Sequence, residues 1–140
     1  LKREKSIQAV FVDYLQLMTS GVKTNNQVNE VTKISNGLKR IAKELDLPVI
    51  ALSQLSRAVE TRGGEKVPQL SDLRDSGSVE QDADMVIFLH RPEYYGVEYD
   101  EQGESTKGMA SAIFAKHRNG SVGQVPLKFE GQYTNFTNAG

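Results

Sequence analysis

The sequence predicts an α/β fold with a mostly parallel sheet that is flanked by helices and ends in antiparallel strands. Two observations support this fold class. An apolar strand, an amphipathic helix and a second apolar strand follow one another in the first third of the chain, and short strands joined by a tight turn close it. With 140 residues, of which 38% are hydrophobic and 25% are charged, the chain has the composition of one soluble globular domain.

The first predicted strand lies in Ala9–Met18, with the sequence AVFVDYLQLM. Val10–Val12 are β-branched or aromatic, and together with Ile7 they predict a short strand that is buried on both faces. Asp13 follows at the carboxyl end of this strand, where open α/β sheets bind their ligands. A carboxylate at that position can hold Mg²⁺, although it can equally cap the turn after a purely structural strand.

A helix is predicted after a polar loop at residues 19–26. Its apolar stripe recurs every three or four residues and consists of Val28, Val31, Ile34, Leu38, Ile41, Ala42 and Leu45. Pro48 ends the helix because the residue before a proline avoids helical geometry. Residues 49–52 then form a second apolar strand, which Ser53 and Gln54 follow. Strand, helix and strand together predict a βαβ unit and hence parallel pairing.

The remainder of the chain is predicted as short elements separated by two long surface loops at 55–73 and 91–107. We expect a short helix at 79–82 and strands at 85–89, at 109–115, around Val125, Leu127 and Phe129, and at 132–136. Residues 118–123 (RNGSVG) predict a tight turn, with Asn119 and Gly120 at positive φ.

Composition narrows the classes of function. The net charge of −1 means that any nucleic-acid binding depends on local basic loops rather than on the overall field. The chain has no cysteine, which excludes disulfides and thiolate metal sites and is typical of a reducing cytosol. It also has no apolar run long enough to span a membrane. We therefore predict a cytoplasmic protein with no membrane partner.

Five fragments occur in an order and spacing that resemble one family. They are VFVDYLQLM, VIALSQLSR, SDLRDSGSVEQDAD, MVIFLHRPEYY and KHRNGSVGQVPLKF. The resemblance is to the carboxyl-terminal RecA-like ATPase domain, a P-loop NTPase core, of the bacterial replicative helicase DnaB. It implies that residues 1–140 are the carboxyl-terminal part of such a domain, beginning just before its Walker B strand. It also implies ATP-driven translocation on single-stranded DNA and unwinding of duplex DNA during replication.

The same resemblance implies roles in ATP hydrolysis for four residues. Asp13 matches the Walker B aspartate that holds the Mg²⁺ of bound ATP. Gln54 matches a glutamine that senses the γ-phosphate, a task that suits an amide because it offers both donors and an acceptor. Lys116 and Arg118 match a basic pair that reaches the ATP of a neighbouring subunit, where an arginine can donate to several phosphate oxygens at once.

A further segment matches the loop that holds the phosphates of single-stranded DNA, and its matching residues are Arg74, Asp75 and Gly77. The chain departs from the family pattern at two positions. Asp75 replaces a more frequent glutamate, which weakens the inference of that contact, and Ser121 replaces a proline, which affects only the stiffness of its turn. The implied partners are single-stranded DNA, five further copies in a homohexamer, a primase and a helicase loader.

The phosphate-binding pattern GxxxxGK[ST] does not occur in the 140 residues. We therefore expect the chain to be a piece of a longer protein, to be inactive alone, and to aggregate through unpaired strand edges. Two other classes stay open from the sequence. One is a different RecA-family ATPase, such as a recombinase or a phage primase–helicase, and the other is a non-catalytic module for single-strand binding or oligomerisation. An intact phosphate loop upstream would separate these classes.

Several titratable residues are assigned no catalytic role. Glu80, Asp82 and Asp84 are expected to cap and solvate a short helix, because no histidine or cysteine joins them at the spacing of metal ligands. His90 and His117 are isolated in the sequence.

Overall fold

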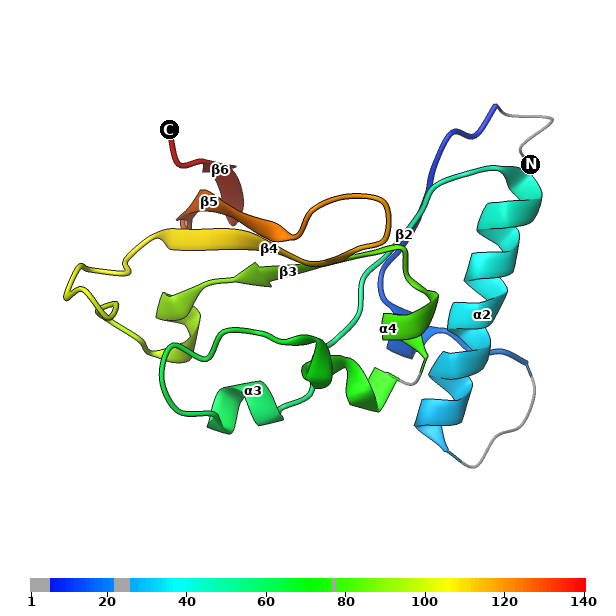
Figure 1. The fold of residues 1–140 in the computed structure, drawn as a ribbon, viewed down its shortest axis with the longest axis horizontal. Coiled ribbons are helices and arrows are strands. Elements are labelled where there is room, and N and C mark those ends of the chain that lie inside the picture. Colours follow the sequence, from blue (N-terminus) through cyan, green and yellow to red (C-terminus); the bar gives the residue numbers. More distant parts are fainter. Residues whose placement is uncertain (1–5, 22–25, 77) are drawn as a thin grey trace. The chain divides into compact units, whose positions relative to one another are not determined.

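The computed structural model describes residues 6–21, 26–76 and 78–140, and for 74–76 it describes the backbone alone. The elements, drawn in Figure 1, are β1 (Val10–Val12), η1 (Leu15–Leu17), α2 (Gln27–Leu45), β2 (Val49–Ala51), α3 (Ala58–Thr61), η2 (Leu70–Ser76), α4 (Val79–Asp82), β3 (Met85–His90), η3 (Pro92–Tyr95), β4 (Met109–His117), β5 (Gly123–Glu130) and β6 (Asn135–Asn138). Part of the predicted loop at 19–26, residues 22–25, lies outside the described residues. No helix in the described ranges is long and apolar enough to cross a membrane.

The chain divides into two compact units. Unit 1 contains the residues up to Ser56 together with Leu73–Ala83, and unit 2 contains Arg57–Asp72 together with Asp84–Gly140. The division falls within η2, between Asp72 and Leu73. Each unit has its own sheet, so each is described by itself.

Unit 1 is a βαβ unit, as the sequence predicts. β1 and β2 pair in parallel, with Val10 opposite Val49 and Val12 opposite Ala51. α2 connects the two strands and runs alongside them (Figure 1). Its apolar stripe closes on η1, because Leu15, Val31 and Ile34 form one buried cluster. The side chains of Val12, Leu38 and Val79 pack around that cluster.

Local sequence signals set both ends of α2. The side chain of Asn26 caps the first turn by accepting a hydrogen bond from the N–H of Val28 at 2.9 Å. Asp46 takes the left-handed conformation directly after the helix, with φ of 49°. Pro48 follows two residues later, so the predicted helix and its end are confirmed.

The prediction that the first strand is buried on both faces is wrong for this chain. Phe11 is 77% exposed and Ile50 is 41% exposed. The two residues are opposite each other in the parallel register and therefore share one face of the pair. The described part of unit 1 builds its apolar cluster around Val12 and Leu15, so it does not cover Phe11.

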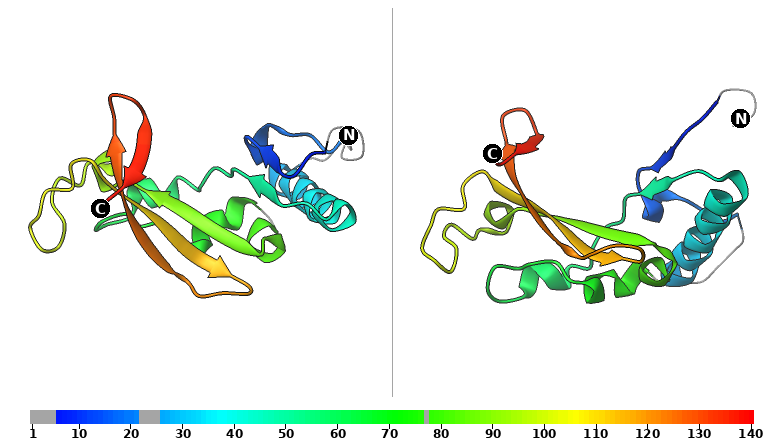
Figure 2. Two further views of the ribbon diagram at one scale, coloured as in Figure 1. Left: turned by 90° about the horizontal axis from the view of Figure 1, so that it is seen from above. Right: turned by 45° about the horizontal axis from the view of Figure 1, so that its top comes forward.

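Unit 2 is built on a four-stranded antiparallel sheet in the order β3, β4, β5, β6, as Figure 2 shows. The prediction of a mostly parallel sheet is therefore wrong in its proportions, because parallel pairing is confined to β1 and β2 in the part of the chain that is described. The physical reason is the connections. Consecutive strands of unit 2 are joined without the crossover helix that parallel pairing requires.

The turn between β4 and β5 corrects a second prediction. Neither Asn119 nor Gly120 has a positive φ. Gly120 is instead required for space, because a Cβ at this position would collide with the imidazole ring of His117. The Asn-Gly pair thus marks the turn correctly, but for a steric reason rather than a conformational one.

Candidate functional site

Asp13 lies at the carboxyl end of β1 in an exposed position, and its peptide bond with Tyr14 is cis. Backbone hydrogen bonds on both sides of it fix its place beside the second strand. Val12 accepts from the N–H of Leu52 at 2.9 Å, and Leu15 donates to the carbonyl of Leu52 at 3.0 Å. The carboxylate therefore lies where the sequence predicts it, at the tip of a parallel strand.

Gln54 follows β2 and is exposed, so unit 1 carries a carboxylate and an amide at the same end of its parallel pair. A residue that the sequence did not single out holds this end together. The Gln16 side chain accepts from the N–H of Gln54 at 3.2 Å and donates to the hydroxyl of Ser53 at 3.1 Å. The only sequence signal for Gln16 is its place within the YLQLM fragment.

The chemistry of this strand end fits Mg²⁺ that is held mainly by a nucleotide. Within the described ranges, no group of three or more histidine, cysteine, aspartate or glutamate residues could hold a metal ion. Mg²⁺ typically takes one or two protein carboxylates and completes its shell with waters and substrate phosphates. A single exposed carboxylate, Asp13, therefore suits a Mg²⁺–nucleotide complex and does not suit a cage of protein ligands.

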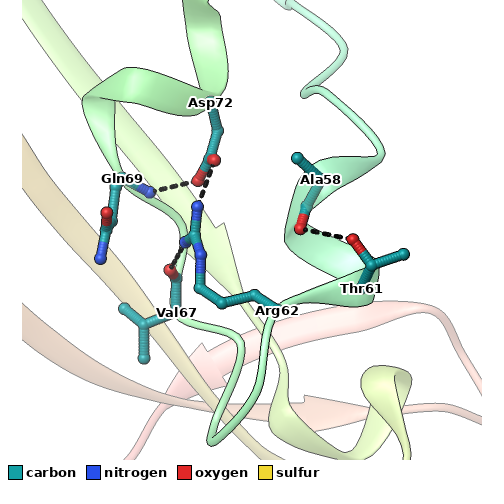
Figure 3. A network of polar contacts seen from close by, with 6 residues as sticks. All are labelled: Ala58, Thr61, Arg62, Val67, Gln69 and Asp72. Carbon is teal, nitrogen blue, oxygen red and sulfur yellow. Dashed lines mark hydrogen bonds and ion pairs between the residues drawn. The ribbon is translucent and has the colours of Figure 1, made fainter.

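Arg74 and Asp75 lie in η2, where the backbone alone is described, and Gly77 lies outside the described residues. What precedes them is well defined (Figure 3). The Asp72 side chain is 3% exposed and pairs with Nη2 of Arg62 at 2.5 Å. The other oxygen of Asp72 accepts from the N–H of Gln69 at 2.7 Å.

The same arginine also holds the loop before η2. Nη1 of Arg62 donates to the carbonyl of Val67 at 2.8 Å, as Figure 3 shows. The polar loop at 55–73 is thus organised by α3, by the first residues of η2 and by one arginine. The sequence predicted a long loop here but gave no indication of the pairing between Arg62 and Asp72.

An analogous anchor follows the candidate DNA segment. Oδ2 of Asp82 accepts from the hydroxyls of Ser35 on α2 at 2.7 Å and of Ser78 at 2.5 Å. Asp82 therefore joins α4 to α2 inside unit 1. The expectation that it only caps and solvates its own helix is too simple, because one of its partners lies on a different helix.

The two basic residues lie at the far end of β4. Lys116 belongs to the strand and faces Val86 in the register, and Arg118 comes one residue after the strand ends. Arg118 is held by Asp84, which accepts from its backbone N–H at 2.8 Å and from its Nη1 at 2.8 Å. The expectation of a purely solvated Asp84 is therefore wrong, because its carboxylate is an ion-pair partner.

His90 contacts an aromatic ring and a backbone carbonyl. His90 is buried, stacks on the Tyr95 ring at 6.0 Å, and places Nε2 at 3.0 Å from the carbonyl of Glu65. Burial lowers the pKa of His90, and the hydrogen bond to Glu65 and the charge of Glu65 oppose this shift in part. Burial therefore favours the neutral imidazole, and Nε2 donates to the backbone carbonyl of Glu65.

These features define an α/β domain that carries polar side chains at the tips of its parallel strands and a basic pair at the end of an antiparallel strand. Residues 1–138 match the family model of the DnaB-like helicase C terminal domain. The chain belongs to this family.

Relatives and solved structures agree with this assignment. The chain is 48% identical over 150 residues to the replicative DNA helicase DnaB of Rickettsia felis, and 49% identical over 137 residues to a probable plasmid replicative DNA helicase of Chlamydia psittaci. These alignments cover 99% and 98% of the chain but only 30% and 28% of the two relatives. The chain thus spans less than a third of the length of these curated relatives.

Two solved structures resemble the chain with a TM-score of 0.84 and 46% sequence identity. One is described as an ATPase domain, and the other is a DnaB-like replicative helicase studied with its interactions with primase. The similarity covers 99% of this chain, and 48% and 33% of those chains. The similarity to an ATPase domain and to a DnaB-like replicative helicase supports the α/β fold class with mixed pairing.

Proposed function

We propose that the chain is part of a replicative DNA helicase that uses ATP hydrolysis to move on single-stranded DNA and to unwind duplex DNA. The observation that carries this proposal is the 48% identity to a replicative helicase over 99% of the chain. Because the chain spans a minor share of that relative, the activity belongs to the whole protein. A RecA-like P-loop core is the corresponding fold, completed by a phosphate loop elsewhere in the protein.

In this proposal, unit 1 contributes the carboxylate and the sensor of an ATP site. Asp13 would hold Mg²⁺ together with the nucleotide phosphates, and the ion would supply neutralisation of phosphate charge. Gln54 responds to the γ-phosphate through its amide. The support is the position of both residues at the ends of paired parallel strands, and the contact from Gln16 that holds the Gln54 backbone.

Unit 2 contributes the basic pair to the ATP of a neighbouring subunit. Lys116 supplies a point charge and Arg118 a planar fork of donors for the transition-state phosphate. This arrangement requires a ring, which we propose is a homohexamer with primase and a helicase loader as partners in the cytoplasm. The link to primase is supported by a structural neighbour, a DnaB-like replicative helicase that is described together with its interactions with primase.

The segment with Arg74, Asp75 and Gly77 is proposed to hold the phosphates of single-stranded DNA. An arginine and backbone amides give charge and hydrogen bonds without reading the sequence, which a motor that moves over any sequence requires. The supporting observation is that Asp72 and Asp82, on either side of this segment, are each fixed by two hydrogen bonds.

A ring-mixing experiment tests the shared ATP site. In a full-length protein that carries this segment, Asp13→Asn and Arg118→Ala should each abolish single-strand-stimulated ATP hydrolysis, the arginine costing on the order of a thousandfold. Rings that mix the two variants should recover activity, because some interfaces then pair an intact Asp13 with an intact Arg118. Arg40→Ala, an exposed arginine on α2, is the matched control and should leave activity unchanged.

Full activity of Arg118→Ala would overturn the proposed role of the basic pair. Absence of recovery in mixed rings would overturn the sharing of the site between subunits. A protein with an intact fold that binds single strands but shows no hydrolysis in any ring would instead favour the non-catalytic binding module.

The DNA contact has a separate test. Arg74→Ala should weaken single-strand binding equally for all sequences and reduce the salt slope of log K by about 0.7, the contribution of one phosphate contact. Arg57→Ala, which removes an exposed arginine outside this segment, is the control. An unchanged salt slope would remove Arg74 from the DNA site.

A further inference from the structure

The attachment of Arg118 to Asp84 extends the β3–β4 ladder by one step. Met85 is opposite His117 at the end of the ladder, and Asp84 and Arg118 are the next residues on each side. The backbone N–H of Arg118 donates to the carbonyl of Asp84 at 2.8 Å. The side chains then meet as well, with Nη1 of Arg118 2.8 Å from Oδ1 of Asp84. The candidate finger is therefore held by one residue at both its backbone and its guanidinium.

A β-bulge in β4 determines on which face of the sheet the side chains near this end lie. Ile87 is opposite Phe114 and Val86 is opposite Lys116, so Ala115 has no partner in the register. The extra residue reverses the alternation of β4, and Lys116 consequently shares a face with Val86 rather than with Phe114. Bulges of this kind commonly redirect side chains next to functional sites.

The ion pair is too exposed to matter much for stability. The side chains of Arg118 and Asp84 are 49% and 60% exposed. Such pairs typically contribute about 0–1 kcal/mol because water screens them and long side chains lose entropy. A pair that adds little stability can nevertheless restrict where a guanidinium points. A guanidinium has five N–H donors, so it can bind a carboxylate and a phosphate at the same time.

We propose that Asp84 is a positioning residue for Arg118, and that it orients the guanidinium toward the phosphates bound by the neighbouring subunit. This inference rests on the proposed function. Asp84 itself does not touch the nucleotide. Asp84 restricts the orientations of the Arg118 guanidinium in advance, so the guanidinium loses less conformational entropy when it binds the transition state.

The first test is Asp84→Asn, which keeps the size of the side chain and the backbone carbonyl but removes the charge. In the full-length ring, we expect kcat for single-strand-stimulated hydrolysis to fall by about tenfold, as expected for a loosely held catalytic group. KM for ATP should stay unchanged. Asp84→Glu should recover part of the activity. Asp100→Asn is the matched control, because it neutralises a carboxylate of unit 2 that accepts hydrogen bonds from the backbone N–H groups of Gln102 and Glu104.

The second test asks whether Asp84 acts through Arg118. In an Arg118→Lys background, which retains a charge without the planar fork, Asp84→Asn should cost much less than it does alone. In rings that mix Asp84→Asn with Asp13→Asn subunits, the rate of ATP hydrolysis should exceed the average of the rates of the two uniform rings. In rings that mix Asp84→Asn with Arg118→Ala subunits, the rate should only equal the average of those two uniform rings. Both changes then lie on the subunit surface that contributes Arg118 to the neighbour, so mixing restores no intact pair of surfaces.

Different results separate this inference from the proposed function. Inactive Arg118→Ala together with fully active Asp84→Asn would overturn the role of Asp84 alone. Strict additivity of Asp84→Asn and Arg118→Lys would overturn it too. Full activity of Arg118→Ala would instead contradict the proposed finger. Equal melting temperatures of Asp84→Asn and Asp100→Asn exclude loss of folding as the cause.

Discussion

The two units differ in what they bury. Unit 1 buries an apolar cluster of Leu15, Val31 and Ile34 beneath its parallel strand pair. Unit 2 also buries apolar side chains, namely Val59, Val86, Phe88 and Ala110. It buries more polar ones than unit 1, and among the side chains that the structure describes these are Asp72, His90, Thr106 and Ser111, against Ser35 in unit 1. Both units therefore have apolar packing, and unit 2 in addition buries several hydrogen-bonding groups that must each find a partner.

The largest effect is expected from the apolar cluster of unit 1. Leu15→Ala should reduce the free energy of unfolding of unit 1 by about 2–5 kcal/mol, because it leaves a cavity against Val31 and Ile34. Hydrogen exchange of the α2 amides in the full-length protein measures this loss. Leu17→Ala removes an exposed side chain two residues away and should change little. An equal rise of exchange in β3–β6 would contradict independent stabilisation of the units.

A smaller loss is expected from the buried carboxylate of unit 2. Asp72→Ala removes the acceptor of Nη2 of Arg62 and of the N–H of Gln69, which should cost about 1–3 kcal/mol. Protection of the amides at 58–72 should fall while that of α2 is retained. Asp100→Ala, which removes a half-buried acceptor of two backbone N–H groups, should cost less. If the two variants lost equal free energy of unfolding, burial of Asp72 would not increase the contribution of its hydrogen bonds to stability.

Gly120→Ala tests steric control of the turn in unit 2. The new Cβ would collide with the ring of His117, and displacing the ring should cost about 1 kcal/mol. Thermal melting measures this cost. The same substitution in a His117→Ala background should be nearly neutral. A cost that persists without the ring would point to the backbone conformation instead.

The smallest expected effect is a pH dependence carried by His90. Its folded pKa lies below the ordinary value of 6.5, so between the two values the unfolded chain binds a proton that the folded chain does not. The stability of unit 2 should therefore be complete above about pH 7 and decrease as the pH falls through about 6.5.

Melting temperatures at about pH 7 and about pH 5.5 test this dependence on His90. His90→Gln keeps a donor for the carbonyl of Glu65 and should reduce the change between the two pH values. His117→Gln is the control, because it replaces the other histidine of the chain. An undiminished pH effect in His90→Gln would assign the dependence to other groups.

The sequence predicted unit 1 well because its signals are local. Helical periodicity and Pro48 predicted α2 and its end, and an apolar run before Asp13 predicted β1. The same reasoning overestimated burial at Phe11, because periodicity shows which residues are apolar but not which partners cover them. It also could not find Gln16, whose partners lie 37 and 38 residues away.

Unit 2 was predicted less completely because its contacts join distant polar residues. The strands at Met85 and Met109 followed from apolar runs, and the structure confirms both. The pairings of Arg62 with Asp72 and of Arg118 with Asp84 depend on the register and on loop geometry, which a single sequence does not reveal. The assigned roles of the site residues remain predictions for the experiments above.

The bulge at Ala115 has a consequence for which changes of length β4 can tolerate. Deletion of Ala115 would place Lys116 directly after Phe114, which restores simple alternation and still leaves Lys116 opposite Val86 on its present face. The constraint on chain length in β4 is therefore weaker at Ala115 than at the residues that are paired in the register. Libraries that vary this strand can exchange or omit Ala115, whereas deletion of a paired residue such as Ile113 would shift the register by one and reverse the faces of the side chains on one side of the deletion.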